Sequence, residues 1–98
     1  MTKTEYLLTC LAEECAEVSK AAIKALRFGL DGSHPDTPMT TNAMALLDEL
    51  TDLATIVQML EIYTGRWFHY EGLSRINKVK RKRVEIYIGK QIWKEIES

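Results

Sequence analysis

The side chains best suited to chemistry in this sequence are carboxylates that occur in pairs within two apolar stretches. Glu14 and Glu17 lie in the stretch LAEECAEV, and Glu49 and Asp52 lie in the stretch LLDELTDLA. Within each pair the acids are three residues apart, so on a helix of about 3.6 residues per turn they share a face. This spacing is suited to holding a metal ion.

Each stretch also contains four apolar residues at helical intervals, and these define the buried stripe that we expect for each helix: Leu11, Cys15, Val18 and Ala22, then Leu46, Leu50, Leu53 and Val57. At about 100° per residue, the first acid of each pair lies about 60° from the centre of its stripe and the second about 120°, on the same side. Carboxylates converging near a core are costly and repel one another unless a cation lies between them. Oxygen ligands alone select a hard ion, so the sequence predicts a site for Mg2+ or, in its place, Mn2+.

Capping residues predict where the first helix begins and ends. Thr2 followed by Glu5 fits a capping box, in which the two side chains satisfy free backbone N–H groups. The helix is therefore expected to run from about residue 3 to Phe28. Gly29 is the expected stop, because glycine tolerates the backbone conformation that closes a helix.

A loop and a second helix are expected next. The segment 30–42 contains both prolines and no apolar period, which predicts a loop longer than most helix connections. Thr41 or Asn42 can cap the second helix, which is expected to continue to about Tyr63 before Gly65 ends it. The two helices should then lie antiparallel, as a hairpin.

The last third of the chain is basic. The segment LSRINKVKRKRVEI has apolar residues at roughly helical intervals, which predicts a third helix from about 70 to 84. Its polar side is expected to carry six positive charges: Arg75, Lys78, Lys80, Arg81, Lys82 and Arg83. In the tail, isoleucines at intervals of four favour a short last helix interrupted or started at Gly89, although the alternation in VEIYI also permits a strand.

Length and charge limit the possible fold and function. The chain has 98 residues, enough for a single domain (1–98) with a modest core. We therefore expect an all-α fold, with a helical hairpin and further helices forming a four-helix-bundle core that oligomerisation completes. The formal net charge of -1 argues against a protein devoted to nucleic acid.

Cysteine usage and hydropathy indicate the compartment. Cys10 and Cys15 are five residues apart on one helix, about 140° around the axis from each other and out of disulfide reach, so we expect two free core thiols in a reducing compartment. No apolar run is long enough for a membrane span, and the start MTKTEYLL lacks the apolar region of a signal peptide. These features predict a soluble, cytoplasmic protein.

The two acidic motifs together resemble a known family. The first motif is EExxE, formed by Glu13, Glu14 and Glu17, and the second is ExxD, formed by Glu49 and Asp52. In this order the two motifs are similar to those of the MazG-like all-α nucleoside triphosphate pyrophosphohydrolases. The apolar surroundings of both motifs and the downstream segment INKVKRKR also match. The resemblance covers about residues 6 to 84, with a longer gap between the two motifs than in many members.

The resemblance implies hydrolysis of a nucleoside triphosphate between its α and β phosphates, releasing the monophosphate and pyrophosphate. By position, it implies four magnesium ligands: Glu14, Glu17, Glu49 and Asp52. Glu13 is expected behind these ligands or assisting the attacking water, so Glu13 and Glu14 are the catalytic candidates. The resemblance further implies contacts to phosphate or sugar from Asn77, Lys78 and Arg81, and assembly into dimers or tetramers.

Other interpretations remain open. A phosphoribosyl-ATP pyrophosphohydrolase shares related helical architecture, and a non-catalytic module could instead bind a partner or nucleic acid through its basic third helix. Lys24 and Arg27 lie near the loop and could reach a phosphate, although surface cations are common. The aromatic residues Phe28, Trp67 and Phe68 are candidates to stack on a base, but such residues more often lie in a core or interface.

Overall fold

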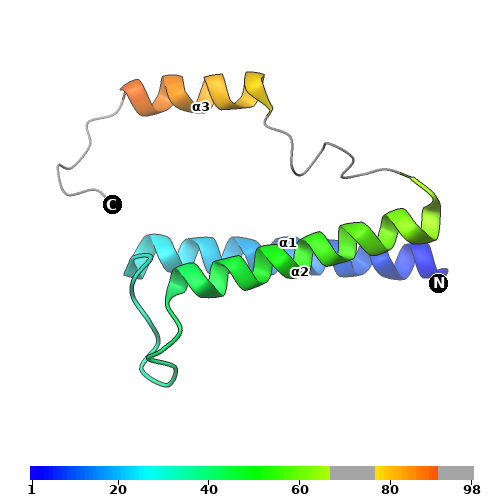
Figure 1. Cartoon of the computed structure of the whole chain (residues 1–98), viewed down its shortest axis with the longest axis horizontal. Helices are drawn as coiled ribbons and strands as arrows, with labels where there is room; N and C mark the ends of the chain where they lie inside the picture. The colour runs from blue at the N-terminus through cyan, green and yellow to red at the C-terminus, as the bar shows by residue number, and fades with distance from the viewer. Residues whose placement is uncertain (67–76, 91–98) are drawn as a thin grey trace.

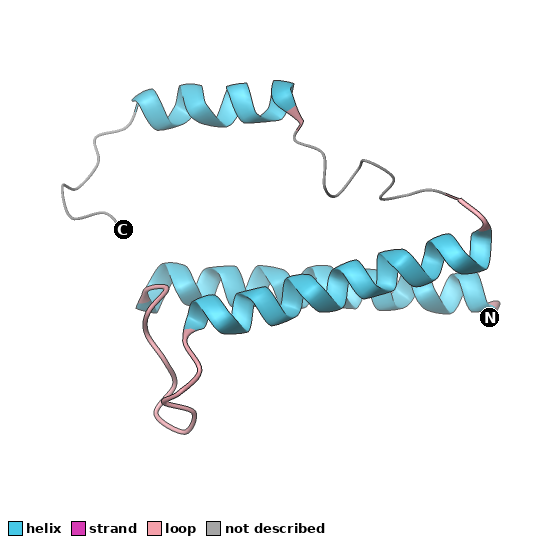
Figure 2. Cartoon of the chain, viewed as in Figure 1, coloured by secondary structure: helices cyan, strands magenta, loops and turns pink. Residues whose placement is uncertain are grey.

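The computed structural model describes residues 1–66 and 77–90, which form three helices (Figure 1). They are α1 (Lys3–Phe28), α2 (Asn42–Thr64) and α3 (Lys78–Lys90). Within these residues there is no strand, only an isolated bridge between Ser33 and Thr41 in the loop (Figure 2). The expected all-α fold is confirmed at this level.

The ends of α1 are those that its capping residues predict. The Thr2 hydroxyl accepts a hydrogen bond from the Glu5 N–H at 3.0 Å, and the Glu5 carboxylate accepts one from the Thr2 N–H at 2.7 Å. At the other end Gly29 has a φ of 87°, and its N–H donates to the Ala25 carbonyl. The predicted capping box and glycine stop are confirmed.

Thr41 caps α2, and Asn42 has a different role. The Thr41 hydroxyl accepts a hydrogen bond from the Met44 N–H at 3.1 Å. The Asn42 side chain is buried and its Nδ2 donates to the Gly29 carbonyl at 2.8 Å, so it ties the two ends of the loop together. At the C-terminal end, Gly65 adopts the left-handed conformation and stops the helix, as expected.

The two long helices pack side by side as an antiparallel hairpin, with the loop at one end (Figure 1). The residues of the hairpin interface are spaced alternately four and three positions apart along each helix. This is the spacing of an antiparallel coiled coil. On α1 the buried and half-buried positions of this series are Leu7, Leu11, Glu14, Val18, Ala21 and Ala25. On α2 they are Asn42, Leu46, Glu49, Leu53, Ile56 and Leu60.

The observed interface corrects the predicted stripes. Cys15, Ala22 and Leu50 were expected inside but are exposed, and the true stripe is turned by roughly 50° toward the acids on both helices. Glu14 and Glu49 are therefore part of the interface rather than at its shoulder. The reason is that a broad apolar arc covers more of each helix than one neighbour can bury.

The cysteines follow their prediction only in part. Cys10 and Cys15 are both free thiols, as their spacing requires. Cys10 is half-buried, whereas Cys15 is exposed, so the expectation that both are core residues is wrong for Cys15. The buried face of α1 is rotated from the predicted one, so that it includes Glu14 and excludes Cys15.

The third helix begins where Asn77 caps it. The Asn77 side-chain oxygen accepts a hydrogen bond from the Lys80 N–H at 3.0 Å, and Arg81 pairs with Glu85 one turn on, at 2.7 Å. The helix continues through Val84 and Gly89 to Lys90, so the expected end near residue 84 and the break at Gly89 are wrong. The preference for helix over strand in VEIYI is confirmed.

Part of the predicted third helix and tail falls on residues 67–76 and 91–98, outside the described residues, including Arg75 and the last two isoleucines. The stacking candidates Trp67 and Phe68 also lie outside the described residues. Within Lys78–Lys90 the basic side chains do not form one polar side. At about 100° per residue they point in all directions around the axis, and every residue of the helix is exposed.

Only α1 and α2 contact each other among the described helices, and α3 lies apart from them (Figure 1). In the described ranges, none of the helices combines the length and the apolar character that a membrane span requires. One chain therefore provides a two-helix hairpin, whose interface contains two glutamates.

Candidate metal centre

Three carboxylates meet in the middle of the hairpin interface. Glu14 comes from α1, and Glu49 and Asp52 come from α2. One oxygen of each lies within 4.8 Å of the others. Glu14 and Glu49 both belong to the four-and-three series that packs between the antiparallel helices, and Asp52 follows Glu49 by about one turn, so the three side chains reach the same place.

Burial of Glu14 is the least ordinary feature of this cluster. Its Oε2 is buried and has no hydrogen-bond partner in the described part of the chain. Desolvation raises the pKa of the Glu14 carboxyl, and the negative charges of Asp52 and Glu49, followed by Glu17 and Glu13, raise it further. A buried polar atom without a partner is costly, and it becomes satisfied when a cation or proton binds there.

The donor set fits a hard divalent cation. Three carboxylates supply only oxygen ligands, which suit Mg2+ or Mn2+, and the cluster includes neither thiolate nor imidazole. Mg2+ usually binds through a few carboxylates and retains water molecules or phosphate oxygens in its other positions. Asp52 is exposed, so one side of the cluster is open to such ligands.

The two remaining acids of the first motif lie outside this trio. Glu17 is exposed on α1, one turn beyond Glu14, with its carboxylate 3.8 Å from the Lys20 ammonium group. Glu13 is exposed next to Glu14. Both are close enough to affect the charge of Glu14, since each contributes to its raised pKa.

Residues of the basic third helix do not join the carboxylates within one chain. Asn77 caps α3, Lys78 is the first residue of that helix, and Arg81 is engaged with Glu85. Because α3 contacts neither α1 nor α2, the structure leaves these three candidate substrate contacts apart from the acidic cluster.

A surface groove of about 410 Å³ adjoins the acids, and its lining comes from the C-terminal half of α1 and the start of α2. Glu17 and Glu49 lie at one end, and Lys20, Lys24 and Arg27 are among its lining residues. From the sequence, Lys24 and Arg27 were minor candidates to reach a phosphate, and Lys20 was not a candidate. Their spacing of four and three residues on one helix was the signal that could have identified them.

The structure therefore brings together three of the four expected metal ligands, places Glu17 at the rim, and adds a groove that contains cations. An oxygen cluster with one unpaired buried atom can hold a divalent ion, and neighbouring cations can bind an anion that the ion also contacts. No family model matches this chain, and comparisons with curated proteins and with solved structures find no similar protein.

Proposed function

We propose that this chain is a Mg2+-dependent nucleoside triphosphate pyrophosphohydrolase in which Mn2+ can replace Mg2+. The observation that carries the proposal is the position of Glu14 and Glu49 at the hairpin interface, with Asp52 beside them and one Glu14 oxygen unpaired. Two glutamates this close together stabilise a hairpin interface less than apolar residues would. A site for a cation accounts for their presence.

In this proposal, Glu14, Glu49 and Asp52 hold the ion, and Glu17 joins them from the rim. A Mg2+ ion held there would supply charge to neutralise phosphate oxygens and would make a water molecule more acidic. Glu13 and Glu14 are the proposed groups that orient this water and accept its proton. The water oxygen forms a bond to the α-phosphorus, the bond from that phosphorus to the bridging oxygen breaks, and the electron pair leaves with pyrophosphate.

The contacts proposed for Asn77, Lys78 and Arg81 involve the phosphates or the sugar. Because α3 lies apart from the hairpin of its own chain, these contacts require the α3 of another copy, or another placement of α3 when substrate binds. Arg81 would also have to exchange its bond to Glu85 for one to phosphate.

The direct test is a screen of common, damaged and phosphoribosyl-linked triphosphates for pyrophosphate release with and without Mg2+. Stoichiometric monophosphate and pyrophosphate are expected, and a chelator should stop the reaction. Release of orthophosphate alone, or no reaction with any substrate, would contradict the proposal. Salt-sensitive binding to nucleic acid without Mg2+ would instead support a binding module based on α3.

We also propose that the chain is a homo-oligomer, a dimer or a tetramer, in which hairpins pair into four-helix bundles. Only three apolar side chains are buried in the described residues, Leu7, Ala25 and Leu60. At about 100° per residue, a set of exposed apolar residues lies on the flank away from the acids: Leu8, Cys15, Ala22 and Leu26 of α1, with Leu47 and Leu50 of α2. A second hairpin on this flank would bury them and leave the acids accessible.

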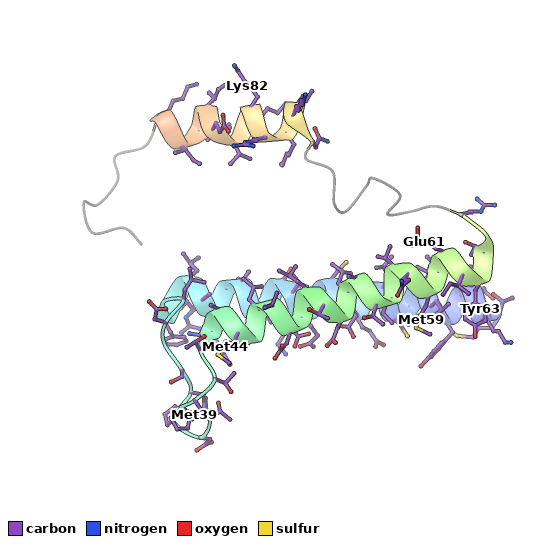
Figure 3. All side chains as sticks on the ribbon, in the orientation of Figure 1. Met39, Met44, Met59, Glu61, Tyr63 and Lys82 are labelled. Carbon is purple, nitrogen blue, oxygen red and sulfur yellow. The ribbon has the colours of Figure 1, made fainter. Side chains whose placement is uncertain are left out.

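Replacing Leu26 with glutamate is expected to dissociate this assembly. Leu26 is 82% exposed in the single chain, so the change costs the hairpin little but places a charge in the proposed interface. Light scattering should give at least twice the chain mass for the wild type and a lower mass for Leu26→Glu. Met39→Glu is the matched control, because Met39 is 86% exposed at the loop tip (Figure 3). A monomeric wild type would contradict the proposed assembly.

A further inference from the structure

The groove beside the acidic cluster contains side chains whose charge changes along α1. Glu17 lies nearest the cluster, and three cations follow at intervals of four and three residues: Lys20, Lys24 and Arg27. These cations therefore extend along α1 for about 10 Å, at about 1.5 Å of rise per residue. We call the groove, with Glu17 and Glu49 at its acidic end, the cationic groove.

The cationic groove is hollow because small residues lie where the two helices meet beneath it. Ala21 of α1 and Ala45 of α2 line it, and neither side chain extends beyond its Cβ. Asn42, whose side chain holds the loop ends together, lines the same groove. The space is thus formed by the helices and the anchored start of α2, so it exists before any ligand binds.

Among the described residues, two of its three cations have no ionic partner. Lys20 lies 3.8 Å from the Glu17 carboxylate. Within the part of the chain that the structure describes, neither Lys24 nor Arg27 forms an ion pair. The Arg27 guanidinium group lies 5.1 Å from the centre of the Phe28 ring, a cation–π contact that favours one position for the arginine. Lys24 and Arg27 are therefore available to bind an anion.

We propose that the cationic groove binds the diphosphate part of the substrate, the β and γ phosphates that leave as pyrophosphate. This inference rests on the proposed hydrolysis at Glu14, Glu49 and Asp52. Negative charge builds up on the bridging oxygen and the departing phosphates as the α-phosphorus bond breaks, and nearby cations stabilise this charge. Lys24 contacts the diphosphate as a point charge, whereas Arg27 offers paired N–H donors to two phosphate oxygens.

The position of the groove gives this diphosphate a direction. Glu17 and Glu49 form the acidic end of the groove, and Glu49 is also one of the three carboxylates of the metal centre, with Glu17 at its rim. A phosphate chain that enters at the acids continues over the cations of the same chain, without any contribution from α3. The group that the groove recognises is a diphosphate. Both a nucleoside triphosphate and free pyrophosphate contain this group, and both are used in the test.

The test measures binding of inorganic pyrophosphate by calorimetry in the presence of Mg2+, together with the KM of a hydrolysed nucleoside triphosphate. Replacing Lys24 or Arg27 with alanine is expected to weaken pyrophosphate binding about ten- to a hundredfold, since each change removes a charge-assisted hydrogen bond. Arg27→Lys should weaken pyrophosphate binding less than Arg27→Ala does, because lysine keeps the positive charge. Lys82→Ala is the control, an exposed cation on α3 (Figure 3) whose loss should change neither quantity.

The outcomes separate this inference from the proposed function. A wild type that hydrolyses a triphosphate, with unchanged pyrophosphate affinity and KM in Lys24→Ala and Arg27→Ala, would overturn the groove assignment and leave the hydrolysis standing. A wild type that hydrolyses nothing but binds pyrophosphate, and loses this binding in both variants, would support the groove and overturn the proposed function. Binding of Mg2+ alone should be equal in all these variants, which shows that the helices and the acids are intact.

Discussion

Alanine at Glu14 or at Asp52 is expected to abolish Mg2+-dependent pyrophosphate release while the helical hairpin stays folded. Each change removes one of three carboxylates whose oxygens lie within 4.8 Å of one another. Metal ions stabilise charge in phosphoryl transfer strongly, so a poorly held ion should lower kcat/KM by about a thousandfold or more. Pyrophosphate release measures the activity, and circular dichroism checks the helix content.

The matched control is Asp48→Ala. Asp48 is an exposed acid next to Glu49 on α2, and it is not part of the carboxylate cluster. The change removes the same charge from the same helix, so a general effect of net charge would appear in this control as well. Wild-type activity in Glu14→Ala or Asp52→Ala would exclude the assigned metal centre, whereas loss of activity in all three variants would point to surface charge instead.

Local signals in the sequence were sufficient to predict the hairpin. The residues that cap the two helices act through hydrogen bonds and backbone conformations within a few residues of their own positions. They are Thr2 with Glu5, Thr41, Gly29 and Gly65. Such features do not depend on the rest of the fold. For the same reason Asn77 could have been identified as the start of α3, since its side chain accepts a hydrogen bond from Lys80 three residues later.

The register of the interface could not be derived in the same way. Apolar side chains cover a wide arc of α1 and α2, and periodicity alone locates the centre of that arc rather than the part that a neighbouring helix covers. The four-and-three series that the hairpin buries includes Glu14, Glu49 and Asn42, which an apolar pattern omits. Exposed Leu50 and Cys15 belong to the other part of the arc, where we propose that a second copy packs.

The cationic groove could not be predicted from the sequence, because it depends on contacts between two helices. Lys20, Lys24 and Arg27 look like ordinary surface residues in the sequence. Their significance comes from Ala45 and Asn42 on α2, which form the space beside them only when the hairpin is closed. The carboxylate pairs with a three-residue spacing could be identified from the sequence, whereas a groove made from small residues on two helices could not.

Glu14→Gln is expected to stabilise the metal-free protein at neutral pH and to remove most of its stabilisation by Mg2+. The pKa of Glu14 is raised above its ordinary value of 4.5, chiefly by desolvation and then by the charges of Asp52 and Glu49. The folded state therefore holds the Glu14 proton more tightly than the unfolded state does. This contribution to stability is complete below pH 4.5 and is lost as the pH rises through the raised pKa.

Above this raised pKa the ionised Glu14 destabilises the wild type unless a cation is bound, and glutamine, which carries no charge, avoids this cost. The melting temperature of metal-free Glu14→Gln should exceed that of the wild type at pH 7, and the difference should shrink toward pH 4. Saturating Mg2+ should raise the wild-type melting temperature by about 5 °C or more and that of Glu14→Gln much less, because a ligand that binds only the folded state stabilises it more when it binds more tightly. Asp48→Asn should follow the wild type in both respects, since Asp48 lies outside the cluster. Equal responses of the wild type and Glu14→Gln to pH and to Mg2+ would show that the buried carboxylate neither repels its neighbours nor binds the ion.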